Sequence, residues 1–130
     1  MKEPSSDTTL LKVLENCELA GITFIRGYIQ FAFEGSGVSP GLNTYTLPQI
    51  RAESKIITHG QYGYCDTLCS LIDKHVISAY EDEEKIVLVF ENNAEVTVSL
   101  KQEDRECAEA AMLQVMQDGK YGEWTVWQYP

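Results

Sequence analysis

The chain has 130 residues, of which 44% are hydrophobic and 23% charged, and its formal net charge is −10. This length predicts one domain over residues 1–130, and the composition excludes a disordered tail, a coiled coil and a collagen-like chain. No apolar run approaches the ~20 residues that span a bilayer, and the first residues lack the apolar core of a signal peptide. We therefore expect a cytoplasmic protein.

The acidic residues are concentrated in the second half of the chain. Residues 1–65 carry five Lys or Arg and six Asp or Glu, whereas residues 66–130 carry five and 14. A protein this acidic does not attract nucleic-acid phosphates or anionic membranes, because proteins bind both of these through Lys and Arg side chains. The charge indicates a basic protein partner, although acidic residues can also serve solubility alone.

The hydrophobic pattern predicts an α+β fold with mostly antiparallel strands. Apolar residues at helical spacing predict short helices at 5–17, 62–72 and 103–117, the first of them capped by Ser6 or Asp7. Alternating apolar and polar residues predict strands at 19–25, 28–33, 42–47, 55–58, 76–80, 85–90, 95–100 and 121–129. The third helix is expected to cover an apolar sheet face.

The chain aligns with itself at an offset of 57 residues. Leu14 then falls on Leu71, and Phe33 falls on Phe90. After the longer loop of the first copy, Thr44 falls on Thr97 at an offset of 53. The halves at about 14–47 and 71–100 are therefore predicted to be two related three-stranded meanders, followed by a C-terminal strand. They could form one long sheet or two layers.

Motifs for catalysis, cofactors and metals are not found in the sequence. There is no nucleophile elbow, zinc-protease helix, phosphate-binding loop or EF-hand spacing. The four cysteines contain no Cys-x-x-Cys pair, and His59 and His75 stand at no motif spacing, so we expect reduced thiols in or near the core. We predict that the protein is not an enzyme and needs no cofactor or metal.

Two groups of residues are candidates for binding a partner. The first is acidic, and the second is aromatic, since Tyr and Trp are common interface anchors. On the last strand Trp124 and Trp127 point to opposite faces, so we expect one of them to be partly exposed. The predicted partner-binding residues are Glu81, Asp82, Glu83, Glu84, Glu103, Asp104, Glu106 and Trp127.

Several segments carry a resemblance to a known group of proteins. They are residues 28–33, 42–48, 62–76, 86–92 and 98–104. Together they resemble a family of small uncharacterised bacterial proteins built from two tandem β-meander repeats. The similarity runs from about residue 14 to 112 and carries over no catalytic residue. Size and acidity are also similar to those of immunity proteins of contact-dependent and polymorphic toxins, which is an analogy of class.

These observations lead to two functional hypotheses. In the first, the protein is an immunity-type inhibitor whose acidic face neutralises a basic, nuclease-like bacterial toxin domain. In the second, it is a non-catalytic structural module that associates with itself as a homodimer through the aromatic edge strand at 121–129.

Overall fold

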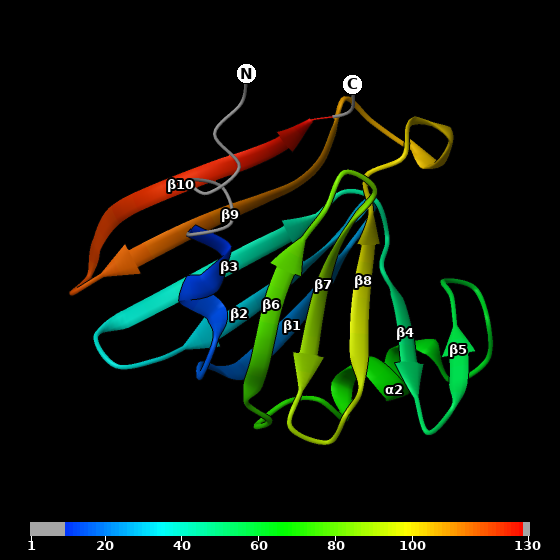
Figure 1. The fold of residues 1–130 in the computed structure, drawn as a ribbon, viewed down its shortest axis with the longest axis horizontal. Helices are drawn as coiled ribbons and strands as arrows, with labels where there is room; N and C mark the ends of the chain where they lie inside the picture. The colour runs from blue at the N-terminus through cyan, green and yellow to red at the C-terminus, as the bar shows by residue number, and fades with distance from the viewer. Residues whose placement is uncertain (1–9, 129–130) are drawn as a thin grey trace.

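The computed structural model describes residues 10–128 and consists mainly of antiparallel strands (Figure 1). The strands are β1 (Glu18–Ile25), β2 (Tyr28–Glu34), β3 (Val38–Thr44), β4 (Gln49–Ala52), β5 (Lys55–Ile57), β6 (Val76–Glu81), β7 (Lys85–Phe90), β8 (Glu95–Ser99), β9 (Glu109–Gln117) and β10 (Lys120–Gln128). The helical elements in the same range are η1 (Lys12–Leu14), α2 (Tyr64–Cys69) and η2 (Gln102–Asp104).

The strands form two five-stranded sheets that pack face to face. Sheet A has the order β1-β2-β3-β9-β10, and sheet B has the order β5-β4-β8-β7-β6. Their strands cross rather than run parallel, so that β10 passes near the end of β6 (Figure 1). One hydrophobic core lies between the sheets and includes Phe31 and Phe33 from sheet A and Leu88 and Phe90 from sheet B.

A short backbone contact joins the two sheets at one corner. Residues 16–19, at the start of β1, run antiparallel to residues 73–76, at the start of β6, around an isolated bridge between Glu18 and His75. The four hydrogen bonds run from Asn16 N–H to Val76 O (2.7 Å), Asp73 N–H to Leu19 O (2.8 Å), Val76 N–H to Cys17 O (2.9 Å) and Leu19 N–H to Lys74 O (3.0 Å). This junction fixes how the two sheets are placed.

The junction is symmetric under the 57-residue offset. The offset relates Asn16 to Asp73, and both residues have positive φ, at 74° and 79°. It also relates Glu18 to His75, the two residues of the bridge. Left-handed backbone is tolerated best by Gly, Asn and Asp, so the residue types suit the turns they make.

The same offset relates the pairing of the strands. Leu19 pairs with Phe33 in the first hairpin, and Val76 pairs with Phe90 in the second, with a register shift directly after Leu19 and after Val76. The third strands differ from expectation. Ile29 pairs with Thr44 while Ile86 pairs with Val98, so Thr44 corresponds to Val98 and not to Thr97.

The helix predicted at 103–117 is wrong. Its first part is η2 and an irregular segment, and its second part is β9, which pairs with both β3 and β10. Ala111, Leu113 and Val115 point into the core, whereas Met112 and Met116 lie on the outer face. The apolar residues therefore follow a period of two, and strand neighbours on both sides supply the backbone hydrogen bonds that a helix would make internally.

The other predicted elements agree in outline. The helix at 62–72 contracts to α2, and the described part of the helix at 5–17 is a helical turn leading into η1, while its predicted caps lie outside the described residues. The strand predicted at 42–47 lies at Val38–Thr44, and β4 was not predicted. Within residues 10–128, no helix is long and apolar enough to cross a membrane.

A single carboxylate connects η1 to the outer edge of sheet B. Glu15 Oε2 accepts the N–H of Ala79 on β6 at 3.0 Å and also contacts Lys12 Nζ at 3.1 Å. The hydrogen bond from Ala79, helped by Lys12, holds the pKa of Glu15 below its ordinary value. A depressed pKa stabilises the folded state above the unfolded pKa and loses that effect as pH falls through the folded pKa.

We predict that Glu15→Gln lowers the free energy of unfolding by about 1 kcal/mol at pH 7, because a neutral amide is a weaker acceptor than a carboxylate. The difference from wild type should shrink between about pH 5 and pH 3, where the carboxylate takes up its proton. Urea unfolding at several pH values measures this, with the exposed Glu53→Gln as control. A difference that does not change with pH would contradict it.

Candidate functional site

The turn between β6 and β7 presents three exposed carboxylates. Asp82 shapes this turn, because its Oδ1 accepts the N–H groups of Glu84 (2.7 Å) and Lys85 (3.0 Å). The backbone N–H of Asp82 also donates to Lys85 O at 3.0 Å. Glu83 and Glu84 are exposed, so their side chains are available to a partner while Asp82 holds the loop in shape.

Glu81, the last residue of β6, connects the turn to sheet A. Its Oε2 accepts the indole N–H of Trp127 on β10 at 3.0 Å. Trp127 is only 7% exposed and belongs to the core, whereas Trp124 is 63% exposed. As expected, one of the two tryptophans is exposed, and it is Trp124. Trp127 was predicted to bind a partner, but it is buried, donates its indole N–H to Glu81 and offers little surface to a partner.

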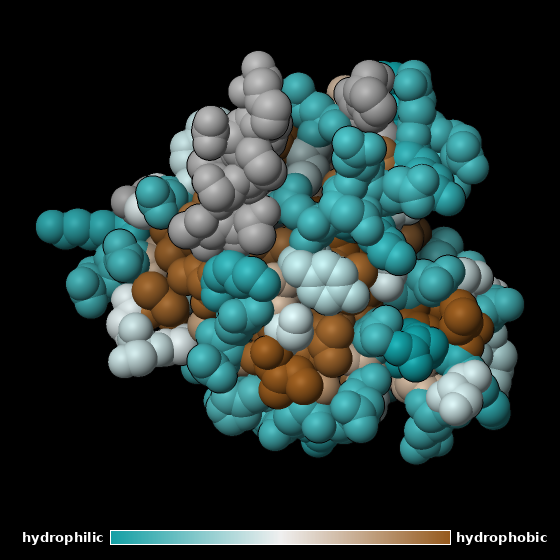
Figure 2. Space-filling view, in the orientation of Figure 1, coloured by the Kyte–Doolittle hydropathy of each residue, from teal (hydrophilic) through white to brown (hydrophobic). Residues whose placement is uncertain are grey.

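The second acidic segment lies beside the turn. Ser99 Oγ at the end of β8 donates to Asp104 Oδ2 at 2.6 Å, and Leu100 N–H donates to Glu84 O at 2.7 Å. These bonds bring 102–106 and the β6–β7 turn to one end of sheet B. Glu103, Asp104 and Glu106 are exposed there, although they are not on a long helix. Hydrophilic residues cover much of this upper end in the view of Figure 2.

We define the acidic end as Glu81, Asp82, Glu83, Glu84, Glu103, Asp104 and Glu106. The structure thus gathers all the predicted acidic residues, which the sequence places in two segments. Neighbouring carboxylates repel one another, and this repulsion is tolerated because most of these side chains are in water. A cationic surface that approaches this end would relieve the repulsion.

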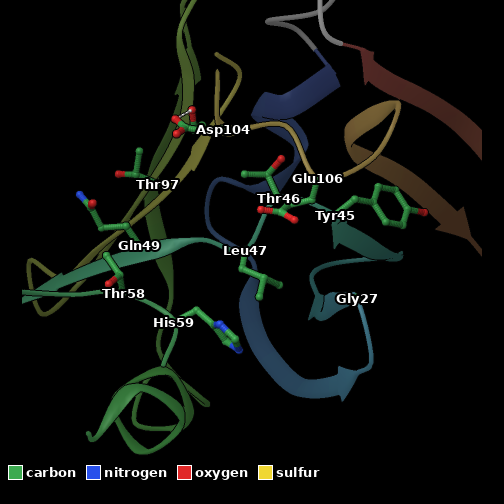
Figure 3. Close-up of a pocket in the computed structure, with 11 residues that line it drawn as sticks. Gly27, Tyr45, Thr46, Leu47, Gln49, Thr58, His59, Thr97, Asp104 and Glu106 are labelled. Atoms are coloured by element: carbon green, nitrogen blue, oxygen red, sulfur yellow. Dashed lines mark hydrogen bonds between the residues drawn. The ribbon is translucent and has the colours of Figure 1, made fainter. Parts of the chain in front are cut away.

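A cleft of about 510 Å³ opens beside the acidic end. Figure 3 shows Leu47 lying between the Glu106 carboxylate on one side and the His59 ring on the other. The lining residues are Gly27, Tyr45, Thr46, Leu47, Gln49, Thr58, His59, Thr97, Ser99, Asp104 and Glu106. None of them is Lys or Arg, and the carboxylates, hydroxyls and amide suit a positively charged or hydrogen-bond-donating group.

Most of the cleft residues were not found from the sequence. His59 follows β5 and packs edge-on against Tyr64 of α2, with ring centroids 5.7 Å apart. The Tyr64 hydroxyl donates to Pro48 O at 2.5 Å, and burial raises the pKa of this hydroxyl. The cleft residues come from β4, β8 and several separate loops, which only the folded chain brings together, so no spacing in the sequence could have indicated them.

The thiols are placed differently from expectation. Cys17 is buried, and burial raises the pKa of its thiol, which lies 3.2 Å from Val13 O. Cys65, Cys69 and Cys107 are exposed, so the expectation of four thiols in or near the core is wrong for three of them. In the part of the chain that the structure describes, no cluster of three or more His, Cys, Asp or Glu could hold a metal ion.

Comparison of the chain with protein-family models, with curated proteins and with solved structures finds no match. The function therefore has to be argued from the site itself.

We predict that Asp82→Ala lowers the free energy of unfolding by about 1–2 kcal/mol, because two turn N–H groups lose their acceptor. Glu83→Ala removes the same charge from the same turn without removing a hydrogen bond of the turn and should change stability by less than about 0.5 kcal/mol. Urea titrations of both variants measure the difference. Equal changes in the free energy of unfolding of the two variants would mean that the lost charge, and not the lost hydrogen bonds of Asp82, determines the stability of this turn.

Proposed function

We propose that the protein is a protein-binding inhibitor of the immunity type, which neutralises a basic, nuclease-like bacterial toxin domain. The observation that carries this proposal is the acidic end, where two segments separated by about twenty residues meet through the contacts of Glu84 with Leu100 and of Asp104 with Ser99. A nuclease needs a cationic groove for its substrate, and an acidic surface can occupy that groove and exclude the substrate.

The negative charge of the protein favours a basic partner. The chain carries a net charge of −10, so its field attracts a basic partner over several ångströms before contact. Glu83 and Glu84 stand at the tip of the turn, and Asp82 holds that tip in place through backbone hydrogen bonds. The fixed loop reduces the ordering cost of binding, which favours a tight complex.

The cleft extends the same surface. Asp104 and Glu106 belong both to the acidic end and to the cleft lining, so a cationic side chain that reaches past the turn would meet carboxylates and hydroxyls. Carboxylates pair with guanidinium groups in a two-point geometry that fixes orientation as well as charge. The acidic end and cleft together fit a protein surface rich in Arg and Lys.

The proposal predicts the outcome of a capture experiment. The tagged protein should retain a single basic protein from the lysate of its own organism at low salt, and retention should weaken at moderate salt. The double variant Glu83→Lys/Glu84→Lys should lose the partner, because its charges now repel a cationic groove. The retained protein is identified by mass spectrometry and assayed for nuclease activity with and without the inhibitor.

The matched control replaces two acidic residues far from the acidic end by Lys. Glu34 and Asp118 are exposed at the opposite end of sheet A, beside the contact of Asp118 with Gly37. Glu34→Lys/Asp118→Lys changes the net charge by the same amount and should retain the partner. Equal loss in both variants would show that only net charge matters, and retention by the first variant would contradict a role for the turn.

The alternative is a self-associating module, and the exposure of Trp124 on an edge strand favours it. In that case light scattering would show a dimer whose population grows with protein concentration, and the capture would yield no basic partner. A monomer at all concentrations would exclude this alternative.

We also propose that the two halves arose by an internal duplication. The equivalent registers of the β1–β2 and β6–β7 hairpins and the symmetric junction around Glu18 and His75 support it. The copies then diverged at the hairpin turn, which is Arg26-Gly27 in the first and the acidic turn in the second. Only the second copy thereby acquired the charge that the proposed function uses.

A further inference from the structure

The four outer edges of the two sheets are not equally protected. The start of β1 is covered by residues 73–76, and the N–H of Ala79 on β6 is bonded to Glu15. β5 is three residues long, which is too short to offer much of an edge. β10 has nine residues and, among the strands that the structure describes, pairs with β9 alone. Natural proteins usually protect exposed strand edges against pairing with another chain. A long unprotected edge therefore indicates a binding site for a partner strand.

The pairing shows which backbone groups this edge offers. Tyr45 N–H donates to Ala110 O at 2.8 Å, so the even-numbered residues of β9 direct their hydrogen bonds to β3. The odd-numbered residues therefore bond to β10, where their partners are Thr125 and Trp127. It follows that Trp124 and Val126 direct their N–H and C=O groups away from the sheet, to the open edge.

The side chains beside these groups suit an interface. Trp124 is 63% exposed, lies opposite Gln114 and shares the outer face of sheet A with Val126 and Met112. No charged side chain lies among these four. Aromatic residues and Met are enriched in interface cores, from which charges are depleted.

The carboxylates near the open edge of β10 favour a basic partner segment. The Trp127 indole reaches Glu81, so the carboxyl-terminal half of β10 lies next to the β6–β7 turn with its exposed Glu83 and Glu84. A strand added to β10 there would run close to these carboxylates. A second copy of this chain would bring another charge of −10 to the same place, whereas a basic segment would be attracted.

We infer that the open edge of β10 is a docking site for an extended, basic segment of a protein partner, which adds to sheet A as a sixth strand. The backbone groups of Trp124 and Val126 pair with it, Trp124 packs against its side chains, and the acidic turn receives its Lys or Arg residues. This inference rests on the proposed function and specifies how the partner binds.

A synthetic probe tests the inference without the partner. The probe is a nine-residue peptide of alternating Lys and Thr, and its control is the same peptide with Glu in place of Lys. In NMR titrations of the ¹⁵N-labelled full chain, the Lys–Thr peptide should shift the amides of Trp124, Val126 and residues 82–84 together, and the Glu–Thr peptide should shift none of them.

Three variants separate strand addition from simple charge attraction. Val126→Pro removes an outward N–H without removing a bond to β9 and should weaken the Lys–Thr peptide at least tenfold, whereas Val126→Ala keeps the N–H and should bind nearly as wild type. Trp124→Ser removes the exposed indole without changing the charge and should also weaken the Lys–Thr peptide at least tenfold. It keeps the test valid if the proline variant fails to fold.

Other results would overturn the inference. Shifts confined to residues 82–84 and 103–106, or undiminished binding by Val126→Pro and Trp124→Ser, would show charge attraction without strand addition. A wild-type dimer that Val126→Pro dissociates would assign the edge to a second copy. If Val126→Pro and Trp124→Ser capture the basic partner as wild type does, the edge inference fails and the inhibitor proposal stands. If the peptide adds to β10 but no basic partner exists, the inhibitor proposal fails alone.

Discussion

The arrangement of the molecule depends on the antiparallel contact between residues 16–19 and 73–76. Four backbone hydrogen bonds around Glu18 and His75 tie β1, an edge strand of sheet A, to β6, an edge strand of sheet B. Side-chain packing between sheets tolerates small rotations, but a hydrogen-bonded register does not slip without losing all its bonds. Leu14 and Leu71, both buried, anchor the two sides of this contact in the common core.

The position of the acidic end follows from this constraint. With the start of β6 fixed against β1, the crossing of the sheets brings the end of β6 under β10, where Glu81 meets Trp127 (Figure 1). The exposed turn, the segment at 102–106 and the cleft lie around that end. The fold thus places a fixed group of carboxylates beside the nine-residue strand β10, which pairs with β9 alone among the strands of residues 10–128.

The sequence predicted much of the sheet structure because strands such as β2 and β8 alternate cleanly between buried and more exposed residues. Ile29, Phe31 and Phe33 all point into the core, as their spacing requires. The sequence prediction failed at 109–117, since residues such as Ala111 and Met112 favour a helix by intrinsic propensity. Pairing of this segment with β3 and β10 on both sides overrides that preference. The acidic residues could be identified from the sequence. Their proximity could not, because Asp104 lies near the β6–β7 turn only through the pairing of β7 with β8. The cleft around His59 depends on loop positions that no local pattern encodes.

The most direct test of this account is the association rate constant of the purified protein with its captured partner, measured as a function of ionic strength. Steering by the acidic end predicts that the rate constant falls at least about tenfold between roughly 20 and 300 mM salt, while the dissociation rate constant changes little. An association rate constant that is independent of salt would contradict the account, because binding would then not depend on the acidic end that the fold assembles.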